Sequence, residues 1–160
     1  MRKPLFATVA ALLLALPAAH AEQPTAADLH LSPPVRGLLQ QEMREVARGT
    51  QTLAIALATA DWKTLHDTAA MIRSSYIMSR QLSAAQKHEL EHALPAGFKQ
   101  LDAEFHARAE KLAHAAEARD HELAAFHYSR LVESCAVCHS GYARSRFPGF
   151  APLTPPAHGH

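Results

Sequence analysis

The sequence has little of what a sheet protein, a nucleic-acid-binding protein or a membrane protein requires. Glycine is scarce, at 6 in 160 residues, and few runs of β-branched residues exist, so little favours a β-sheet. The formal net charge is only +1, which argues against a nucleic-acid-binding surface and against an acidic tail. Beyond the N-terminus no run of about 18 apolar residues occurs, so we expect no membrane span in the mature chain.

The residues that are abundant fit one helical domain. Hydrophobic residues make up 48% of the sequence and charged residues 19%, a balance that suits a packed core rather than a disordered chain. Alanine, leucine, glutamate, glutamine and lysine recur, and these are strong helix formers. We therefore predict a single all-α domain.

Residues 1–21 are typical of a cleavable signal peptide. Arg2 and Lys3 precede an apolar stretch at 5–16, and Ala-His-Ala at 19–21 matches a cleavage site. We expect export to the periplasm. Cleavage would change the formal net charge from +1 to −1, because 16 basic residues become 14 against 15 acidic ones.

Four long amphipathic segments follow, with apolar residues at helical spacings of three and four. Ser32, Asp61, Ser83 and Asp120 suit helix N-caps, and Pro95 interrupts a short helix between the second and third long ones. Short connections between long helices predict an antiparallel four-helix bundle over 22–146, followed by an irregular, proline-rich tail at 147–160. The expected inward faces are Leu39, Met43, Val46, Thr50, Leu53, Leu57; Trp62, Leu65, Ala69, Ile72, Tyr76; Phe98, Leu101, Phe105, Ala109, Leu112, Ala116; and Leu123, Phe126, Leu131, Cys135, Cys138.

Residues 135–139, Cys-Ala-Val-Cys-His, have the C-x-x-C-H spacing of a c-type haem attachment site. On a helix, positions i, i+3 and i+4 share one face, so both thiols reach the two vinyl groups of one porphyrin and the histidine meets its iron. A redox-active disulfide would follow a strand, and a structural zinc site would need a second cysteine pair; the sequence offers neither. We predict one covalent haem c with its iron, held by Cys135 and Cys138, with His139 as the proximal ligand.

The position of this motif, on the last of four helices, resembles that of the cytochrome c prime family. The resemblance covers about residues 33–146 and extends to Tyr142, an aromatic residue three positions after the histidine. The family commonly has a basic residue next, whereas this chain has Ala143 there, with Arg144 just beyond. The resemblance implies a four-helix bundle with a distal haem face covered by the first helix. A homodimer through the first two helices is one assembly that it implies.

The residue on the distal face separates the functions that the resemblance implies. An apolar residue there accompanies five-coordinate iron that binds small gases, and a methionine accompanies six-coordinate iron that transfers electrons. Met43 lies on the expected inward face of the first helix, and a thioether stabilises ferrous iron. The family often places the distal residue four positions after an arginine. Counting from Arg36 gives Gln40, which leaves a polar or empty sixth site as an alternative.

Three further residues are candidates for the haem propionates. Arg36 shares a helical face with Met43, and Tyr142 and Arg144 lie close to the attachment motif. With both axial positions filled, we expect a monohaem electron carrier with unidentified redox partners rather than an enzyme. The alternative is a five-coordinate haem protein that binds nitric oxide or carbon monoxide.

Most of the other histidines are expected to do less. His88 to His92 match the H-E-x-x-H pattern of zinc proteases, but Pro95 ends that helix at once, so we expect a solvated helix face. His106 and His127 are expected to be surface histidines or histidines with internal hydrogen-bond partners.

Overall fold

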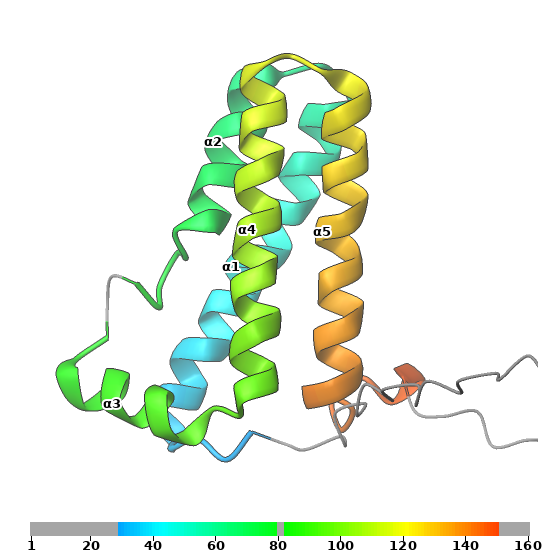
Figure 1. Ribbon diagram of the computed structural model, residues 1–160. Helices are drawn as coiled ribbons and strands as arrows, with labels where there is room; N and C mark the ends of the chain where they lie inside the picture. Colours follow the sequence, from blue (N-terminus) through cyan, green and yellow to red (C-terminus); the bar gives the residue numbers. More distant parts are fainter. Residues whose placement is uncertain (1–28, 80–81, 151–160) are drawn as a thin grey trace, which may run out of the picture.

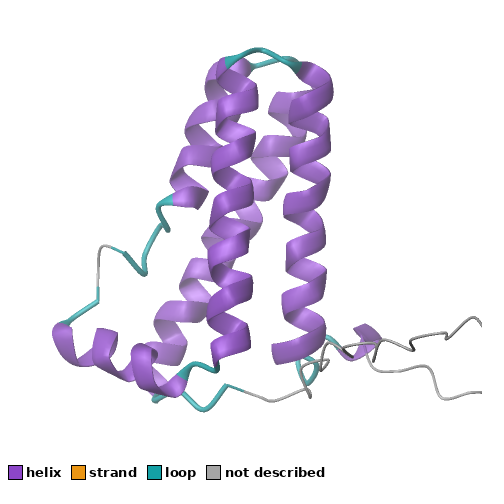
Figure 2. Ribbon diagram, viewed as in Figure 1, coloured by secondary structure: helices purple, strands orange, loops and turns teal. Residues whose placement is uncertain are grey.

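Four long helices form an antiparallel bundle, which confirms the predicted all-α class (Figure 1). The computed structural model describes residues 29–79 and 82–150, in which no strand forms (Figure 2). The predicted signal peptide and residues 151–160 of the predicted tail lie outside this range. The elements are α1 (Pro33–Ala58), α2 (Trp62–Arg73), α3 (Ala84–Ala93), α4 (Ala96–Glu117), α5 (His121–Tyr142) and the 3-10 turn η1 (Pro148–Phe150). None of the described helices is both long and apolar enough to cross a bilayer.

The helices contact one another in the order α1, α2, α4, α5, and α5 closes the bundle against α1. The contact between α1 and α5 is the smallest of the four. Figure 1 shows the reason: α1 crosses the bundle at an angle, so its C-terminal half approaches α5 and its N-terminal half diverges from it. The short helix α3 lies crosswise at the end of the bundle where α1 begins and α5 ends.

The buried core fills the half of the bundle away from the C-x-x-C-H motif. Its largest fully buried side chains include Leu53, Leu65, Ile72, Leu112 and Leu131, one or two from each long helix. Burying a side chain of this kind contributes about 1.5–3 kcal/mol, so this half of the bundle supplies most of the packing free energy. The half that carries the motif is packed by fewer large buried side chains, so it is better able to accommodate a cofactor.

Polar side chains begin three of the helices as the sequence predicts. The Asp61 carboxylate accepts a hydrogen bond from the Thr64 amide at 3.1 Å, and Asp120 accepts one from Leu123 at 2.9 Å. Ser83 forms a complete capping box with Gln86. Ser32 is the N-cap residue of α1 as predicted, but its hydroxyl donates to Glu89 Oε2 at 2.8 Å instead of accepting a hydrogen bond from the first turn.

The buried face of α1 is rotated about the helix axis relative to the predicted face, by about half of the 100° that separates consecutive residues. Met43 was expected inward and is 41% exposed, while its neighbour Glu42 is only 3% exposed. The small residues Gly49 and Ala56 let α2 approach closely and so turn this side of α1 towards it. The buried residues of α1 are Val35, Glu42, Val46, Gly49, Leu53 and Ala56.

The predicted face of α5 also needs correction at its start. Leu123 and Phe126 were expected inward and are 43% and 56% exposed. Ala124 and Leu131 face the core instead, both fully buried. The predicted faces of α2 and α4 are confirmed by the burial of Leu65, Ala69, Ile72, Phe98, Ala109, Leu112 and Ala116, but Tyr76, predicted on the second helix, lies beyond its end at Arg73.

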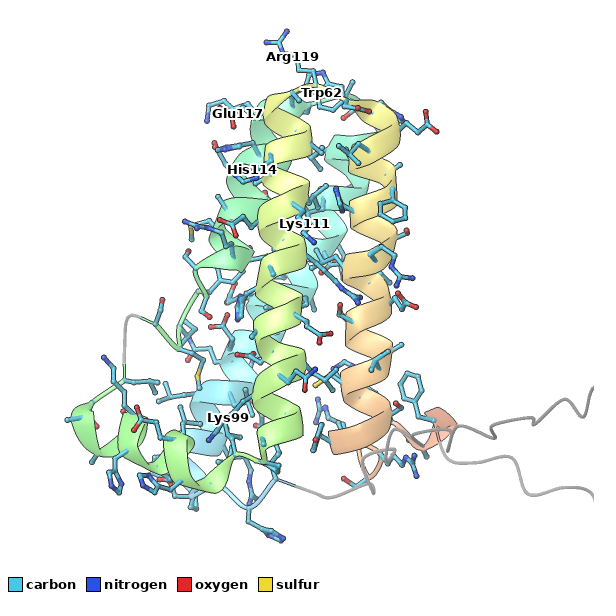
Figure 3. All side chains as sticks on the ribbon, in the orientation of Figure 1. Trp62, Lys99, Lys111, His114, Glu117 and Arg119 are labelled. Atoms are coloured by element: carbon cyan, nitrogen blue, oxygen red, sulfur yellow. The ribbon has the colours of Figure 1, made fainter. Side chains whose placement is uncertain are left out.

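The two tight turns at the far end of the bundle each hold a non-glycine residue in the left-handed region. Ala60, between α1 and α2, has φ 54°, and Arg119, between α4 and α5, has φ 54°. In Figure 3, Arg119 and Trp62 mark these turns at the same end of the bundle. A Cβ atom in this conformation costs free energy that glycine avoids.

We predict that Ala60→Gly raises the free energy of unfolding by about 0.5–1 kcal/mol, because relief of the left-handed strain outweighs the added freedom of the unfolded chain. The matched control is Ala103→Gly, at an exposed interior position of α4, which should lower it by about 1 kcal/mol. Urea denaturation of both variants measures the difference. If Ala60→Gly destabilises the protein as much as the control does, the turn is not strained.

Candidate haem site

The C-x-x-C-H motif occupies the last turns of α5. Cys135, Cys138 and His139 are all partly buried, and the two cysteines are not bonded to each other. Cys135 Sγ lies 3.7 Å from the carbonyl oxygen of Leu131, one turn earlier on α5. The helix therefore presents two thiols and an imidazole within about one turn, as the sequence predicts.

Burial sets the protonation of these three side chains. It raises the pKa of Cys138 to about 11, with smaller contributions from Asp102 and Cys135, and it also raises the pKa of Cys135. Burial lowers the pKa of His139. The thiols are therefore protonated at neutral pH, and the imidazole is in the neutral form that binds metal ions.

The contact between α5 and α1 fixes how the two helices face each other. The Tyr128 hydroxyl lies 3.4 Å from the carbonyl oxygen of Thr50. Seven residues are nearly two helical turns, and the two helices are antiparallel. Seven residues after Tyr128 on α5 is Cys135, and seven residues before Thr50 on α1 is Met43, so both positions lie at about the same level along the bundle. His139 lies about one further turn along the same face of α5. Seven residues before Thr50, Met43 lies on the same side of α1 as Thr50.

The exposed fraction of Met43 has a local cause. Met43 lies in the N-terminal half of α1, the half that diverges from α5 in Figure 1, and its side chain is 41% exposed. The polar alternative, Gln40, is also exposed, but its position lies farther round α1 from the Thr50 side. The thioether of Met43 is apolar and a soft ligand, so it is chemically suited to contact a haem and its iron.

Of the three candidate propionate partners, the structure leaves two near solvent and buries one. The Arg36 guanidinium is exposed on the first turn of α1 and donates to the carbonyl oxygen of Leu31 at 3.1 Å. Arg144 Nε donates to the carbonyl oxygen of Ser140 at 2.5 Å. Tyr142, by contrast, is 8% exposed and packs edge-on against Phe98 at 5.4 Å between ring centroids.

Tyr142 closes the end of the bundle between α4 and α5. A Cβ atom at Gly97, on the first turn of α4, would lie 2.7 Å from the Tyr142 hydroxyl oxygen. Only glycine allows this close approach. The aromatic residue after the motif therefore anchors the end of α5 to α4, a role that the sequence did not reveal.

The described residues around His139 include one contact that sequence reasoning missed. The Phe147 ring stacks on the imidazole with 4.6 Å between centroids and 21° between planes. The Arg146 guanidinium lies 5.9 Å from the centroid of the same ring. The start of the predicted tail thus folds back over the proximal histidine, and an aromatic residue eight positions after it is the only sequence signal for this contact.

The α4 side of the site carries a polar pair that the sequence did not single out. His106 Nδ1 donates to the carbonyl oxygen of Ile72 at 2.9 Å, and its Nε2 lies 3.6 Å from Asp102 Oδ1. Asp102 also contributes to the raised pKa of Cys138, so its charge acts on the attachment motif. The expectation that His106 has internal partners is confirmed.

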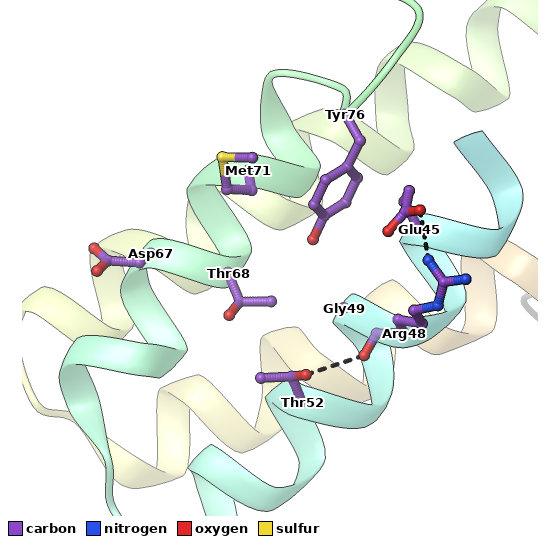
Figure 4. Close-up of a pocket in the computed structure, with 8 residues that line it drawn as sticks. All are labelled: Glu45, Arg48, Gly49, Thr52, Asp67, Thr68, Met71 and Tyr76. Carbon is purple, nitrogen blue, oxygen red and sulfur yellow. Dashed lines mark hydrogen bonds and ion pairs between the residues drawn. The ribbon is translucent and has the colours of Figure 1, made fainter. Parts of the chain in front are cut away.

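Two other candidate sites lie apart from the motif. A shallow pocket of about 280 Å³ between α1 and α2 is lined by charged and polar side chains such as Glu45, Arg48 and Asp67 (Figure 4). In α3, His88 and His92 stack on each other at 4.1 Å, and Glu89 is engaged by Ser32. Within residues 29–79 and 82–150 no group of three or more metal-ligating side chains forms, so the H-E-x-x-H pattern makes no described metal centre.

The donor set at the end of α5 fits a covalent haem. Two protonated thiols one turn apart suit two thioether bonds, and a neutral imidazole suits iron. A helical bundle with these groups on its last helix is a haem-binding c-type cytochrome.

Comparison with known protein families agrees with this class. The family described as Cytochrome C' matches residues 37–143, about two thirds of the chain. The chain belongs to the cytochrome c' family, whose members carry covalently bound haem c and generally transfer electrons or bind gases. A search of curated proteins and a search of solved structures each found no match.

We predict that replacing both cysteines, Cys135→Ser with Cys138→Ser, abolishes covalent haem attachment, because no other thiol exists in the chain. Denaturing electrophoresis with haem staining, and the mass of the exported protein, measure attachment. Ser134→Ala, beside the motif and outside it, should retain the full haem mass. A double variant that still carries haem after denaturation would contradict this assignment of the two thiols.

A second prediction concerns the polar pair on α4. The interaction with the Asp102 carboxylate, 3.6 Å away, is the main cause that raises the pKa of His106, against the opposing effect of burial. The folded state therefore favours protonated His106, and the resulting stability is fully present below about pH 6.5 and lost as the pH rises through the raised pKa. We expect His106→Gln to lower the free energy of unfolding more at about pH 5.5 than at about pH 8.5.

Urea denaturation at the two pH values tests this pair, and Asp102→Asn serves as the partner control. With Asp102 replaced, the cost of His106→Gln should no longer depend on pH to the same degree. An equal cost at both pH values in the unmodified background would show that His106 is not protonated preferentially in the folded state.

Proposed function

We propose that this protein is an exported, monohaem electron carrier with six-coordinate iron. Cys135 and Cys138 hold the haem, His139 is the proximal ligand and Met43 the distal one. The observation that carries the proposal is the register of α1 and α5: from the Thr50–Tyr128 contact, the same step of seven residues leads to Met43 on one helix and Cys135 on the other.

The chemistry of the two axial residues supports electron transfer. Bound haem supplies an iron that accepts and releases one electron without a change in covalent bonding. His139 is held neutral by burial and so offers a lone pair without first losing a proton. The Met43 thioether is a soft, uncharged ligand that favours the ferrous state and raises the reduction potential.

Other residues of the chain support the same function. Arg36 lies on the first turn of α1 and Arg144 just after α5 ends, and either guanidinium could offer charge-assisted hydrogen bonds to haem propionates. Tyr142 holds the end of α5 against α4, and Phe147 covers one face of the proximal imidazole. These contacts restrict the movement of the proximal side, which keeps the reorganisation on electron transfer small.

The proposal includes a location and an assembly. The signal-like segment at 1–21 supports export to the periplasm, where family members are typically found. We further infer a non-enzymatic role, because both axial positions are assigned to protein ligands. A homodimer through α1 and α2 remains an expectation from the family resemblance.

A gas-binding function is the second candidate, and one observation favours it. Met43 is 41% exposed on a half of α1 that diverges from α5. If α1 does not close on the haem, the distal position stays free for nitric oxide or carbon monoxide. The ferric spectrum distinguishes the two functions, because a bound thioether gives low-spin iron.

We predict that the ferric holoprotein is low-spin, with a sulfur-to-iron charge-transfer band that Met43→Ala abolishes. Met71→Ala on α2 and Gln40→Ala on α1 are matched controls and should leave the band unchanged. A high-spin ferric spectrum that Met43→Ala does not alter would instead support the gas-binding function. A band that persists in Met43→Ala and is lost in Met71→Ala would reassign the distal sulfur ligand.

A further inference from the structure

Glu42 is the one acidic side chain that α1 buries, and it lies directly before Met43. Its carboxylate accepts three hydrogen bonds from consecutive backbone amides in the segment that follows α2. The donors are Tyr76 at 2.9 Å to Oε1, Ile77 at 2.5 Å to Oε2 and Met78 at 3.1 Å to Oε2. A buried carboxylate is stable only with such partners, so α1 is tied to this segment.

Two further contacts tie the connection between α2 and α4 to the N-terminal half of α1. The Tyr76 side chain lies over α1 at Gly49, where an added Cβ atom would be 2.5 Å from its hydroxyl oxygen (Figure 4). At the other end, the Glu89 carboxylate of α3 accepts from the Ser32 amide at 2.6 Å and from its hydroxyl at 2.8 Å. The stretch from Ser32 to Gly49 is therefore tied at three points to the connection between α2 and α4.

These contacts determine which way Met43 faces. Consecutive residues on a helix point about 100° apart, so fixing Glu42 towards residues 76–78 fixes the direction of Met43. That direction is the side of Thr50, which α5 contacts through Tyr128. If α1 rotated by one residue step, Glu42 would lose its three donors and Met43 would turn away from the attachment motif.

The chemistry of Glu42 differs from what simple packing requires. The positions seven residues before and after it are Val35 and Gly49, both buried, and an apolar residue between them would pack without any need for partners. Replacing a buried charge by a well-packed apolar side chain is often neutral or stabilising for the fold. The carboxylate instead restricts α1 to one rotation, because only one rotation satisfies it.

We propose that Glu42 is a positioning residue for the distal haem ligand: its three hydrogen bonds to residues 76–78 hold α1 in the rotation that presents Met43 to the iron. This inference rests on the proposed function, in which Met43 is that ligand. Glu42 touches neither the ligand's sulfur nor the cofactor, and it acts through the orientation of the helix.

The test compares Glu42→Gln and Glu42→Asp with the wild-type holoprotein. Gln keeps the length of the side chain but brings an NH2 group against amide donors, and Asp keeps the charge but withdraws it from them. We expect Glu42→Gln to lose most of the sulfur-to-iron band and to bind carbon monoxide at least about tenfold faster in the ferrous state, since hydrogen bonds to a charged group stabilise by more than one factor of ten. Glu42→Asp should be intermediate in both readouts.

Amide hydrogen exchange reports on the contact itself. In Glu42→Gln the amides of residues 76–78 should exchange about 10-fold to 100-fold faster, while amides in the core of α4 keep their protection. Glu45→Gln is the matched control, because Glu45 lies one turn along α1 and pairs with Arg48 on the outer surface. This control should leave the band, the carbon monoxide rate and the exchange unchanged.

The possible outcomes separate the two proposals. If the wild type shows the band, Met43→Ala abolishes it and Glu42→Gln keeps it at full intensity while exchange at 76–78 rises, Met43 is the ligand and the positioning role is overturned. If the wild type lacks the band, or Met43→Ala leaves it unchanged, the ligand assignment fails and the positioning role falls with it. If Glu42→Gln does not fold, Glu42→Asp decides: a wild-type band with accelerated exchange at 76–78 overturns the proposal.

Discussion

The hydrogen bonds between the Glu42 carboxylate and the amides of residues 76–78 constrain this bundle more than any other polar contact described in it. A charge that is 3% exposed must be satisfied inside the protein, and its partners lie in the connection after α2 rather than on α5. The N-terminal half of α1 consequently follows that connection and separates from α5. These hydrogen bonds thus maintain the divergence of α1 from α5, which occurs at the end of the bundle where α5 carries the attachment motif.

One half of the bundle contains the buried hydrophobic core, and the other half carries the C-x-x-C-H motif. The large buried side chains, such as Leu53, Leu65 and Leu112, come from the ends of the helices joined by the tight turns. The other half holds the motif, the half-buried thiols and Met43, with Tyr142 anchoring α5 to the first turn of α4. Because stability is concentrated away from the site, the site can present an incompletely packed surface without loss of the fold.

Much of this arrangement could be predicted from the sequence because it depends on local signals. The N-caps at Asp61, Ser83 and Asp120 and the apolar spacing of α2 and α4 are set by residues within a few positions of one another. The haem motif is local as well, since its three side chains lie within about one turn. The caps and the apolar faces are confirmed in the fold, and the motif lies on a helix as expected.

The features that escaped prediction depend on contacts between distant segments. Glu42 occupies a core position in a series spaced every seven residues, Val35, Glu42, Gly49 and Ala56, but an acidic residue does not stand out as a core position in an apolar pattern. Its partners are backbone amides more than thirty residues away, and backbone donors leave no trace in side-chain patterns. For the same reason the sequence predicts that the Ser32 side chain caps α1, whereas its hydroxyl donates to Glu89 on α3.

The proposed electron carrier depends on Met43 of α1 binding the iron opposite His139. The most direct measurement is the NMR spectrum of the ferrous holoprotein with carbon-13-labelled methionine methyl groups. A methyl group bound through its sulfur lies over the porphyrin ring and is shifted far upfield by the ring current, so the account predicts this shift for Met43 and ordinary positions for Met71 and Met78. A Met43 methyl resonance that stays beside those of Met71 and Met78 would contradict it.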